Sequence, residues 1–225
     1  MTIQNWVIGQ LVKSVRFNGW PGITVEPIGE HGVKALRPGR PDAVGYCVEP
    51  DNVNQFTVRV LEEAVSELPQ TGMIIVTRRV VDPEVYQRAP ELGVCVDTFG
   101  GFTRAVGTFD DVSRYLHTEE TYFRKRMSFT RVVTSVIRRG HRAWELKRAN
   151  RLRSLTVVTH ERYELTDDEF AMLLNQYPML PLDALVITNS AAQGFGDRVV
   201  KSSQQVGVPL FTLDDFVSQI RAPWA

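Results

Sequence analysis

The sequence predicts an α/β protein built from two strand-helix-strand-helix-strand units joined by a basic helical segment. Two short and wholly apolar runs, 72–77 and 184–188, are typical of strands that are buried on both faces of a helix-covered parallel sheet. Around each run a similar order of apolar strand, polar loop and amphipathic helix recurs. Between the two units lies a stretch with eleven Lys and Arg and one acid, Glu145.

This basic stretch, 124–153, carries a formal charge of +10 in a chain whose net charge is zero. Val133, Val136, Gly140 and Trp144 recur at three- and four-residue steps, which indicates one apolar face of a helix. A strongly basic span in a neutral protein needs an acidic partner, inside or outside the chain. The candidate nucleic-acid contacts are Arg124, Lys125, Arg126, Arg131, Arg138, Arg139, Arg142, Lys147, Arg148 and Arg151.

Two interpretations of this basic helix remain open. In one, it is a solvated connector whose arginines pair with acids elsewhere in the chain. In the other, it presents a cationic surface to phosphate groups, and binding weakens steeply with salt because each neutralised phosphate releases counterions.

Composition is that of an ordinary globular protein, with 43% hydrophobic and 23% charged residues. No apolar run approaches the roughly 20 residues that span a bilayer, and residues 1–17 lack the pattern of a signal peptide. Cys47 and Cys95 lie in apolar, strand-like runs, so we expect buried free thiols and a cytoplasmic location without a membrane partner.

The first unit is expected to span 1–118. Its opening helix carries Trp6, Val7, Leu11 and Val15 at helical spacing, and the Gly29–Gly32 turn predicts a hairpin. The expected helices are 4–17, 54–68, 82–92 and 108–116, and the expected strands are 23–25, 33–36, 43–48, 72–77 and 94–96.

The second, smaller unit is expected to span 154–225, after a basic connector at 119–153. Thr166 and Glu169 form a capping box that starts a helix. The expected strands are 155–158, 184–188 and 208–212, and the expected helices are 166–176, 198–205 and 213–220.

Matching features favour an internal repeat. Both central strands end in threonine, Thr77 and Thr188, and a Gly-Val pair precedes the last strand of each unit. A phenylalanine then follows in each unit, Phe102 and Phe216. Duplication and the general likeness of α/β units both explain this pattern.

The order of elements in 4–116 resembles the restriction-endonuclease-like (PD-(D/E)XK) superfamily, and most of all the Mrr-type nuclease domain. That family needs an acid on one strand, then an acid or Gln and a Lys two residues apart on the next. The resemblance implies Asp42 as the first acid and Glu49 as the second, with Asp51 in place of the lysine. It therefore implies catalytic Asp42, Glu49 and Asp51, with Asp42 and Glu49 holding Mg²⁺.

The missing lysine favours a degenerate, non-cleaving relative that binds nucleic acid, DNA rather than RNA, through the basic helix. An active metal-dependent endonuclease and a non-catalytic protein-interaction module are the alternatives, and a homodimer or a protein partner fits the last of these. His160 and Glu161 follow the strand 155–158, and the carboxyl ends of strands are where α/β proteins tend to bind ligands.

Overall fold

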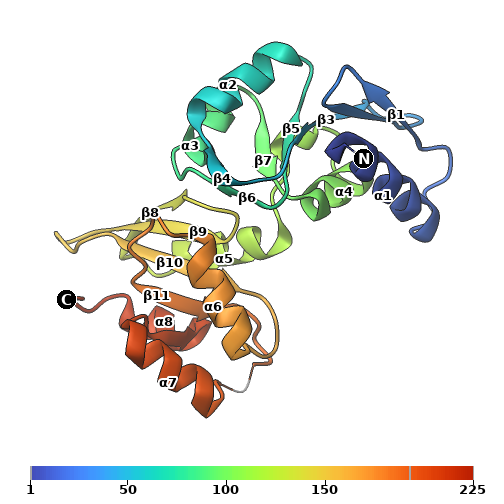
Figure 1. Cartoon of the computed structure of the whole chain (residues 1–225). Helices are drawn as coiled ribbons and strands as arrows, with labels where there is room; N and C mark the ends of the chain where they lie inside the picture. Colours follow the sequence, from blue (N-terminus) through green and yellow to red (C-terminus); the bar gives the residue numbers. More distant parts are fainter. Residues whose placement is uncertain (1, 193, 225) are drawn as a thin grey trace. The chain divides into compact units, whose positions relative to one another are not determined.

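In the computed structural model, which describes residues 2–192 and 194–224, the chain divides into two compact units, Met1–Tyr115 and Leu116–Ala225. Both are mixed α/β units, so the predicted fold class is confirmed (Figure 1). None of the described helices is long and apolar enough to cross a membrane.

The first unit begins with a helix and a three-stranded antiparallel meander, after which helices and parallel strands alternate. Its elements are α1 (Ile3–Phe17), β1 (Thr24–Ile28), β2 (Gly32–Leu36), β3 (Ala43–Val48), β4 (Asp51–Phe56), α2 (Val58–Glu67), β5 (Met73–Val76), β6 (Arg79–Val81), α3 (Val85–Glu91), β7 (Cys95–Asp97), α4 (Phe99–Thr108) and the short 3-10 helix η1 (Val112–Arg114).

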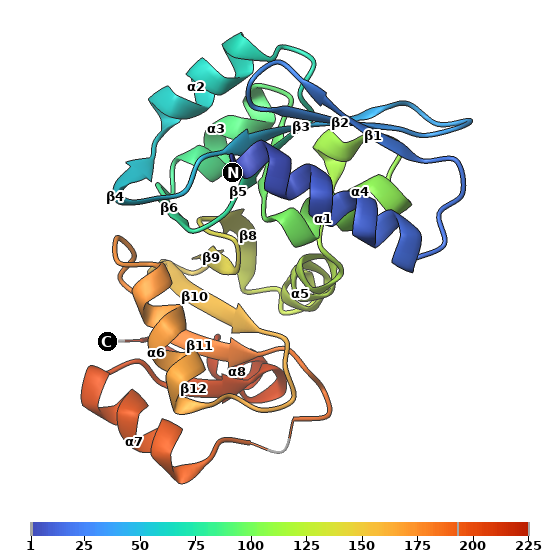
Figure 2. The ribbon, with the colours of Figure 1, turned by 45° about the vertical axis from the view of Figure 1, so that its right-hand side comes forward.

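Its main sheet has the strand order β1-β2-β3-β5-β7, antiparallel between the first three strands and parallel from β3 onward. The parallel strands β3, β5 and β7 are buried on both faces because alternate residues pack against different helices. Met73 and Ile75 face α1 and α4, whereas Ile74 and Val76 face α2 and α3. Figure 2 shows α1 and α4 side by side against this sheet.

The second unit repeats this order. Its elements are α5 (Thr118–Ser128), β8 (Val133–Arg138), β9 (Ala143–Arg148), β10 (Leu155–His160), α6 (Asp167–Gln176), β11 (Ala184–Ile187), α7 (Asp197–Val206), β12 (Leu210–Thr212) and α8 (Leu213–Gln219). The strand order is β8-β9-β10-β11-β12, again antiparallel up to β10 and parallel from there. The first and last helices pack on one face of the sheet, and α6 and α7 on the other.

The two sheets also share their register. Residues 45–48 of β3 pair with 73–76 of β5, and residues 157–160 of β10 pair with 184–187 of β11. In each unit a glutamate follows the first of these strands and a threonine follows the second. These residues are Glu49 and Thr77 in the first unit, and Glu161 and Thr188 in the second. The main difference in topology is the small parallel pair β4–β6, which only the first unit carries among the described residues.

A buried arginine holds the last helix in each unit. Arg37, at the end of β2, donates to the carbonyl of Val106 in the last turn of α4 and to those of Phe109 and Asp110 just beyond it. Arg148, at the end of β9, donates to the carbonyls of Ile220 and Ala222 beyond α8. A guanidinium has five donors and suits the unpaired carbonyls at the end of a helix, so this repeated contact supports a common plan for the two units.

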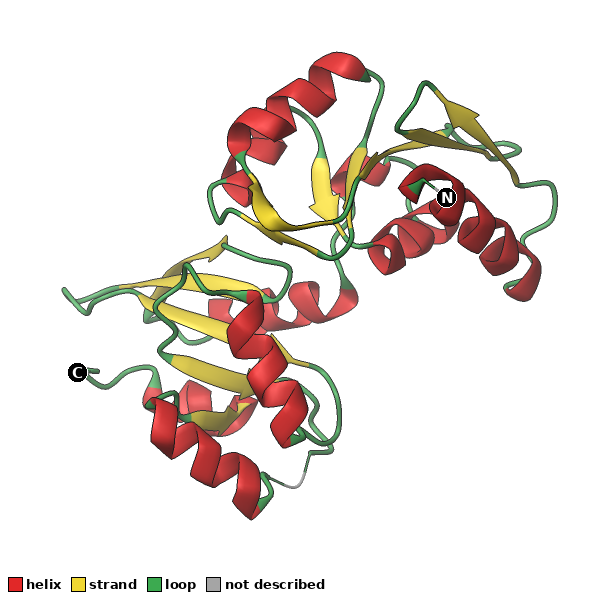
Figure 3. Cartoon of the chain, viewed as in Figure 1, coloured by secondary structure: helices red, strands yellow, loops and turns green. Residues whose placement is uncertain are grey.

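The predicted basic helix is wrong over most of its length. Only its start belongs to a helix, α5, and 133–148 forms the β8–β9 hairpin (Figure 3). Gly140 lies in the turn of this hairpin, where an added Cβ would come within 2.5 Å of the Tyr177 ring. The apolar positions that fit a helical period also fit strands, and β-branched residues such as Val133, Val136 and Ile137 favour strands.

The predicted connector 119–153 is therefore not separate from the second unit, since it supplies the first helix and two of the five strands of that unit. Two other predicted helices differ from the structure. Residues 51–56 form β4 before α2, and the helix predicted at 108–116 lies earlier, at 99–108. Turn chemistry explains the second error: Thr98, whose side chain accepts from Gly101 N–H, starts α4 despite the Gly pair that follows.

Candidate functional site

Asp42 and Glu49 lie at opposite ends of a single strand. Asp42 precedes β3 and Glu49 follows it, so the six residues of this strand lie between them. Seven steps of extended chain, at 3.3 Å each, make the distance about 23 Å. An ion whose ligands lie roughly 2–2.5 Å away cannot bind both carboxylates. The structure therefore does not bring the predicted metal pair together, whereas the resemblance requires acids on neighbouring strands.

Each of these three acids has a local role instead. Asp42 pairs with Lys34 at 3.0 Å, and Glu49 accepts a hydrogen bond from Ile3 N–H at 3.2 Å. Asp51 closes the turn at the start of β4 by accepting from the N–H groups of Val53 and Asn54 and from the Asn54 side chain. The Asn54 and Val53 hydrogen bonds lower the pKa of Asp51 to about 2.

Most of the predicted nucleic-acid contacts have partners within the second unit. Arg124 and Arg138 pair with the buried Glu120, and the Arg124 guanidinium also lies over the Trp144 ring. The other acidic partners are Asp214 for Arg126, Glu145 for Arg139 and Lys147, and both Glu119 and Glu161 for Arg142, while Arg148 contacts carbonyls.

Three of the predicted contacts are exposed and lack such a partner among the described residues: Lys125, Arg131 and Arg151. Arg131 and Arg151 have φ of 58° and 60°, in the left-handed region that residues other than glycine rarely adopt. They flank the open end of the β8–β9 hairpin, where Ala149 N–H donates to Val132 O at 2.8 Å. We call Lys125, Arg131 and Arg151, with Phe129 (70% exposed), the cationic end of the second unit.

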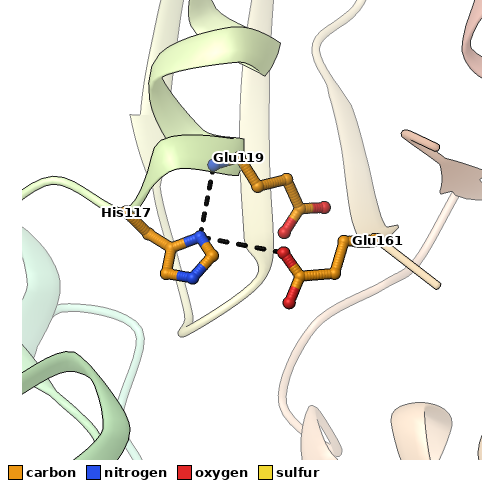
Figure 4. A group of neighbouring side chains, drawn as sticks. All are labelled: His117, Glu119 and Glu161. Atoms are coloured by element: carbon orange, nitrogen blue, oxygen red, sulfur yellow. Dashed lines mark hydrogen bonds and ion pairs between the residues drawn. The ribbon is translucent and has the colours of Figure 1, made fainter. Parts of the chain in front are cut away.

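A cluster of charged residues lies at the carboxyl ends of β10 and β11 (Figure 4). His117 is the N-cap of α5, and its Nδ1 accepts from Glu119 N–H at 3.2 Å. The buried Glu119 carboxylate accepts from the Thr188 hydroxyl at 2.6 Å and pairs with Arg142. Arg142 also pairs with Glu161 at 3.0 Å. A guanidinium thus joins two carboxylates that come from different elements.

His117, Glu119 and Glu161 have the spacing of metal ligands, with one candidate atom of each within 4.8 Å of the others. The donor set does not fit a metal, however. The Nδ1 lone pair of His117 already accepts a backbone N–H, and Arg142 already supplies the positive charge between the two carboxylates. We therefore describe the cluster as an ion-pair network that holds the start of α5 against the sheet.

The sequence indicates two members of this network, Glu161 by its place after a strand and Arg142 as part of the basic span. His160, predicted beside Glu161, lies outside the network: its ring lies 3.3 Å from Glu164 O, and burial lowers its pKa. Glu119 and Glu120 give the only available signal for the rest, because two acids at the start of a helix directly precede the basic span.

The corresponding place in the first unit contains a cavity of about 210 Å³. Ile3, Trp6 and Pro50 form its apolar walls, and Glu49, Thr77 and Arg78 supply its polar groups. The Thr77 hydroxyl oxygen is buried and has no hydrogen-bond partner among the described residues.

Comparison with known proteins adds no assignment to this geometry. No protein-family model, curated protein or solved structure matches the chain.

Proposed function

We propose that the second unit binds the sugar-phosphate backbone of nucleic acid through its cationic end and does not cleave it. The observation that carries this proposal is the pair of exposed arginines, Arg131 and Arg151, at the open end of one hairpin. Both adopt left-handed backbone conformations, which cost about 1–2 kcal/mol each. Backbone strain of this kind clusters at functional sites.

The charge of the unit supports the same function. Residues 116–225 contain fifteen Lys and Arg against twelve Asp and Glu, a net charge of +3, whereas residues 1–115 have a net charge of −3. Lys125, Arg131 and Arg151 are among the exposed cations of this unit that have no acidic partner among the described residues. Phosphate contacts of this kind are independent of sequence.

The exposed Phe129 ring favours nucleic acid over an acidic protein as the partner. It directly follows α5 and lies between Lys125 and Arg131 in the chain, with 70% of its surface exposed. Base-aromatic stacking beside a basic groove is how proteins bind single strands without sequence preference. We therefore expect single-stranded DNA to bind more tightly than duplex DNA.

Fluorescence anisotropy with labelled single-stranded and duplex DNA tests the proposal. With three phosphate contacts, affinity should fall about 40-fold for duplex DNA and about 20-fold for single-stranded DNA between 50 and 200 mM salt, and Arg131→Glu with Arg151→Glu should reduce the salt slope by about 2. Arg198→Glu with Lys201→Glu is the matched control, because it makes the same charge change on α7, which packs on the other face of the sheet. No binding at 50 mM salt, or an equal loss in the control, would refute the proposal and leave the protein-interaction alternative.

A further inference from the structure

The shared register places the first unit's cavity at the position of the second unit's ion-pair network. Cys47 N–H donates to His31 O at 2.8 Å, and Thr159 N–H donates to Arg142 O at 2.8 Å, one residue before the end of β3 and β10 respectively. Glu49 and Thr77 therefore correspond to Glu161 and Thr188, and His31 corresponds to Arg142.

The opening helices complete this correspondence. Val7 and Leu11 are the buried positions that face the sheet in α1, and Phe123 and Met127 are those of α5. When Val7 is matched with Phe123 and Leu11 with Met127, Ile3 takes the position of Glu119. The first unit thus has an isoleucine where the second has a buried carboxylate.

Two charged groups of the second unit's network, the Glu119 carboxylate and the Arg142 guanidinium, therefore have no counterpart among the described residues of the first unit. The carboxylate that accepts from Thr188 has no counterpart, which leaves the buried Thr77 hydroxyl without an acceptor. The guanidinium that joins the two glutamates has none either, because His31 pairs with Glu67 at 2.8 Å and stacks on Tyr46. Glu49 is the counterpart of Glu161. One of its carboxylate oxygens accepts from Ile3 N–H, and the other is left for a ligand.

We propose that this cavity binds a free α-amino acid with an apolar side chain. Such a molecule supplies both missing charges, because its ammonium and carboxylate groups are bonded to the same carbon atom. Its ammonium group pairs with Glu49, and its carboxylate accepts from Thr77 and pairs with Arg78. The apolar side chain packs against Ile3, Trp6 and Pro50, in a volume of about 210 Å³. Pockets of this kind combine apolar walls with a few placed polar groups.

Arg78 supports this orientation. It follows Thr77 directly, is exposed and has a φ of 50°, and it makes no ion pair with Glu49 among the described residues. Its guanidinium is therefore available to a carboxylate beside the Thr77 hydroxyl. Charge-assisted hydrogen bonds of this type are the stronger ones.

Titration of the full chain with L-leucine, followed by the ¹⁵N-indole resonance of Trp6, tests the inference. We expect saturable binding that is at least about tenfold weaker for 3-methylbutylamine and for 4-methylpentanoate, which each lack one charge; tenfold corresponds to about 1.4 kcal/mol. Glu49→Gln keeps the acceptor for Ile3 N–H but removes the charge, and should weaken leucine binding at least about tenfold.

Glu161→Gln, at the equivalent position of the second unit, is the matched control and should leave leucine binding unchanged. Thr77→Val removes the hydroxyl at nearly constant volume and should also weaken binding. The proposal fails if leucine does not shift the Trp6 resonance in the folded protein, if the single-charge analogues bind equally well, or if both Gln variants behave alike. It is independent of nucleic-acid binding, which uses other residues.

Discussion

The two units share one strand order and register but differ in the side chains at the carboxyl ends of their central strands. At the carboxyl ends of their central strands, the second unit joins Glu119, Arg142 and Glu161 in ion pairs. The first unit has Ile3, a cavity and a Thr77 hydroxyl without a hydrogen-bond partner in the described part of the chain. The backbone around both places is the same in strand order and register. The difference shows that a few side chains decide whether such a place holds an ion-pair network or a cavity.

The largest expected effect comes from removing the cation of the network. Arg142→Met leaves the buried Glu119 carboxylate without its counter-charge, and breaking a buried pair in this way costs about 3–5 kcal/mol. Urea denaturation of the full chain, with hydrogen exchange read for each unit, should show the loss in residues 116–225.

The corresponding change in the first unit, His31→Ala, should cost less than about 1 kcal/mol, because the His31–Glu67 pair is partly exposed. Adding Glu119→Gln to Arg142→Met should restore part of the lost stability. If His31→Ala and Arg142→Met lower the stability equally, the first unit's cavity and the second unit's ion-pair network do not differ as described.

A second prediction concerns the feature that the units share. Arg37→Met and Arg148→Met each leave several buried carbonyls without a donor, which costs about 1–3 kcal/mol or more. Because both arginines hold the end of the last helix in their unit, we expect similar losses, each confined to its own unit in hydrogen exchange. If either Arg37→Met or Arg148→Met leaves the stability unchanged, the two contacts are not equivalent.

The smallest effect concerns the β4–β6 pair, which distinguishes the first unit. Asp51 has a folded pKa of about 2, below the usual value of about 3.9 for the unfolded chain. Its contribution to stability is therefore complete above about pH 4 and is lost as the pH falls toward 2. The protection of 51–56 against hydrogen exchange, measured relative to the intrinsic rate at each pH, should fall over that range, and Asp51→Asn should remove most of this pH dependence while 133–148 stays unaffected by the substitution.

Much of the fold follows from local patterns in the sequence. The short apolar runs became the central strands β5 and β11, the Thr166–Glu169 capping box starts α6, and both cysteines are buried free thiols. Burial raises the pKa of the Cys47 thiol to about 12. These features were predictable because caps, turns and buried strands depend on residues that are close together in the chain.

The site was less predictable because its residues come from distant segments. Glu119 and Thr188 are 69 residues apart, yet their side chains share a hydrogen bond. The basic span illustrates the same limit: its apolar spacing fitted a helix, and pairing with β10 made it a sheet edge instead.

The sequence by itself determined the α/β class, the positions of most strands and helices, and the concentration of positive charge between residues 124 and 153. Only the tertiary structure decided that this charge is mostly neutralised inside one unit, and that Asp42 and Glu49 lie at opposite ends of one strand. The physical reason is that local patterns fix the type of an element, whereas the partner of a charge depends on which elements the sheet brings together.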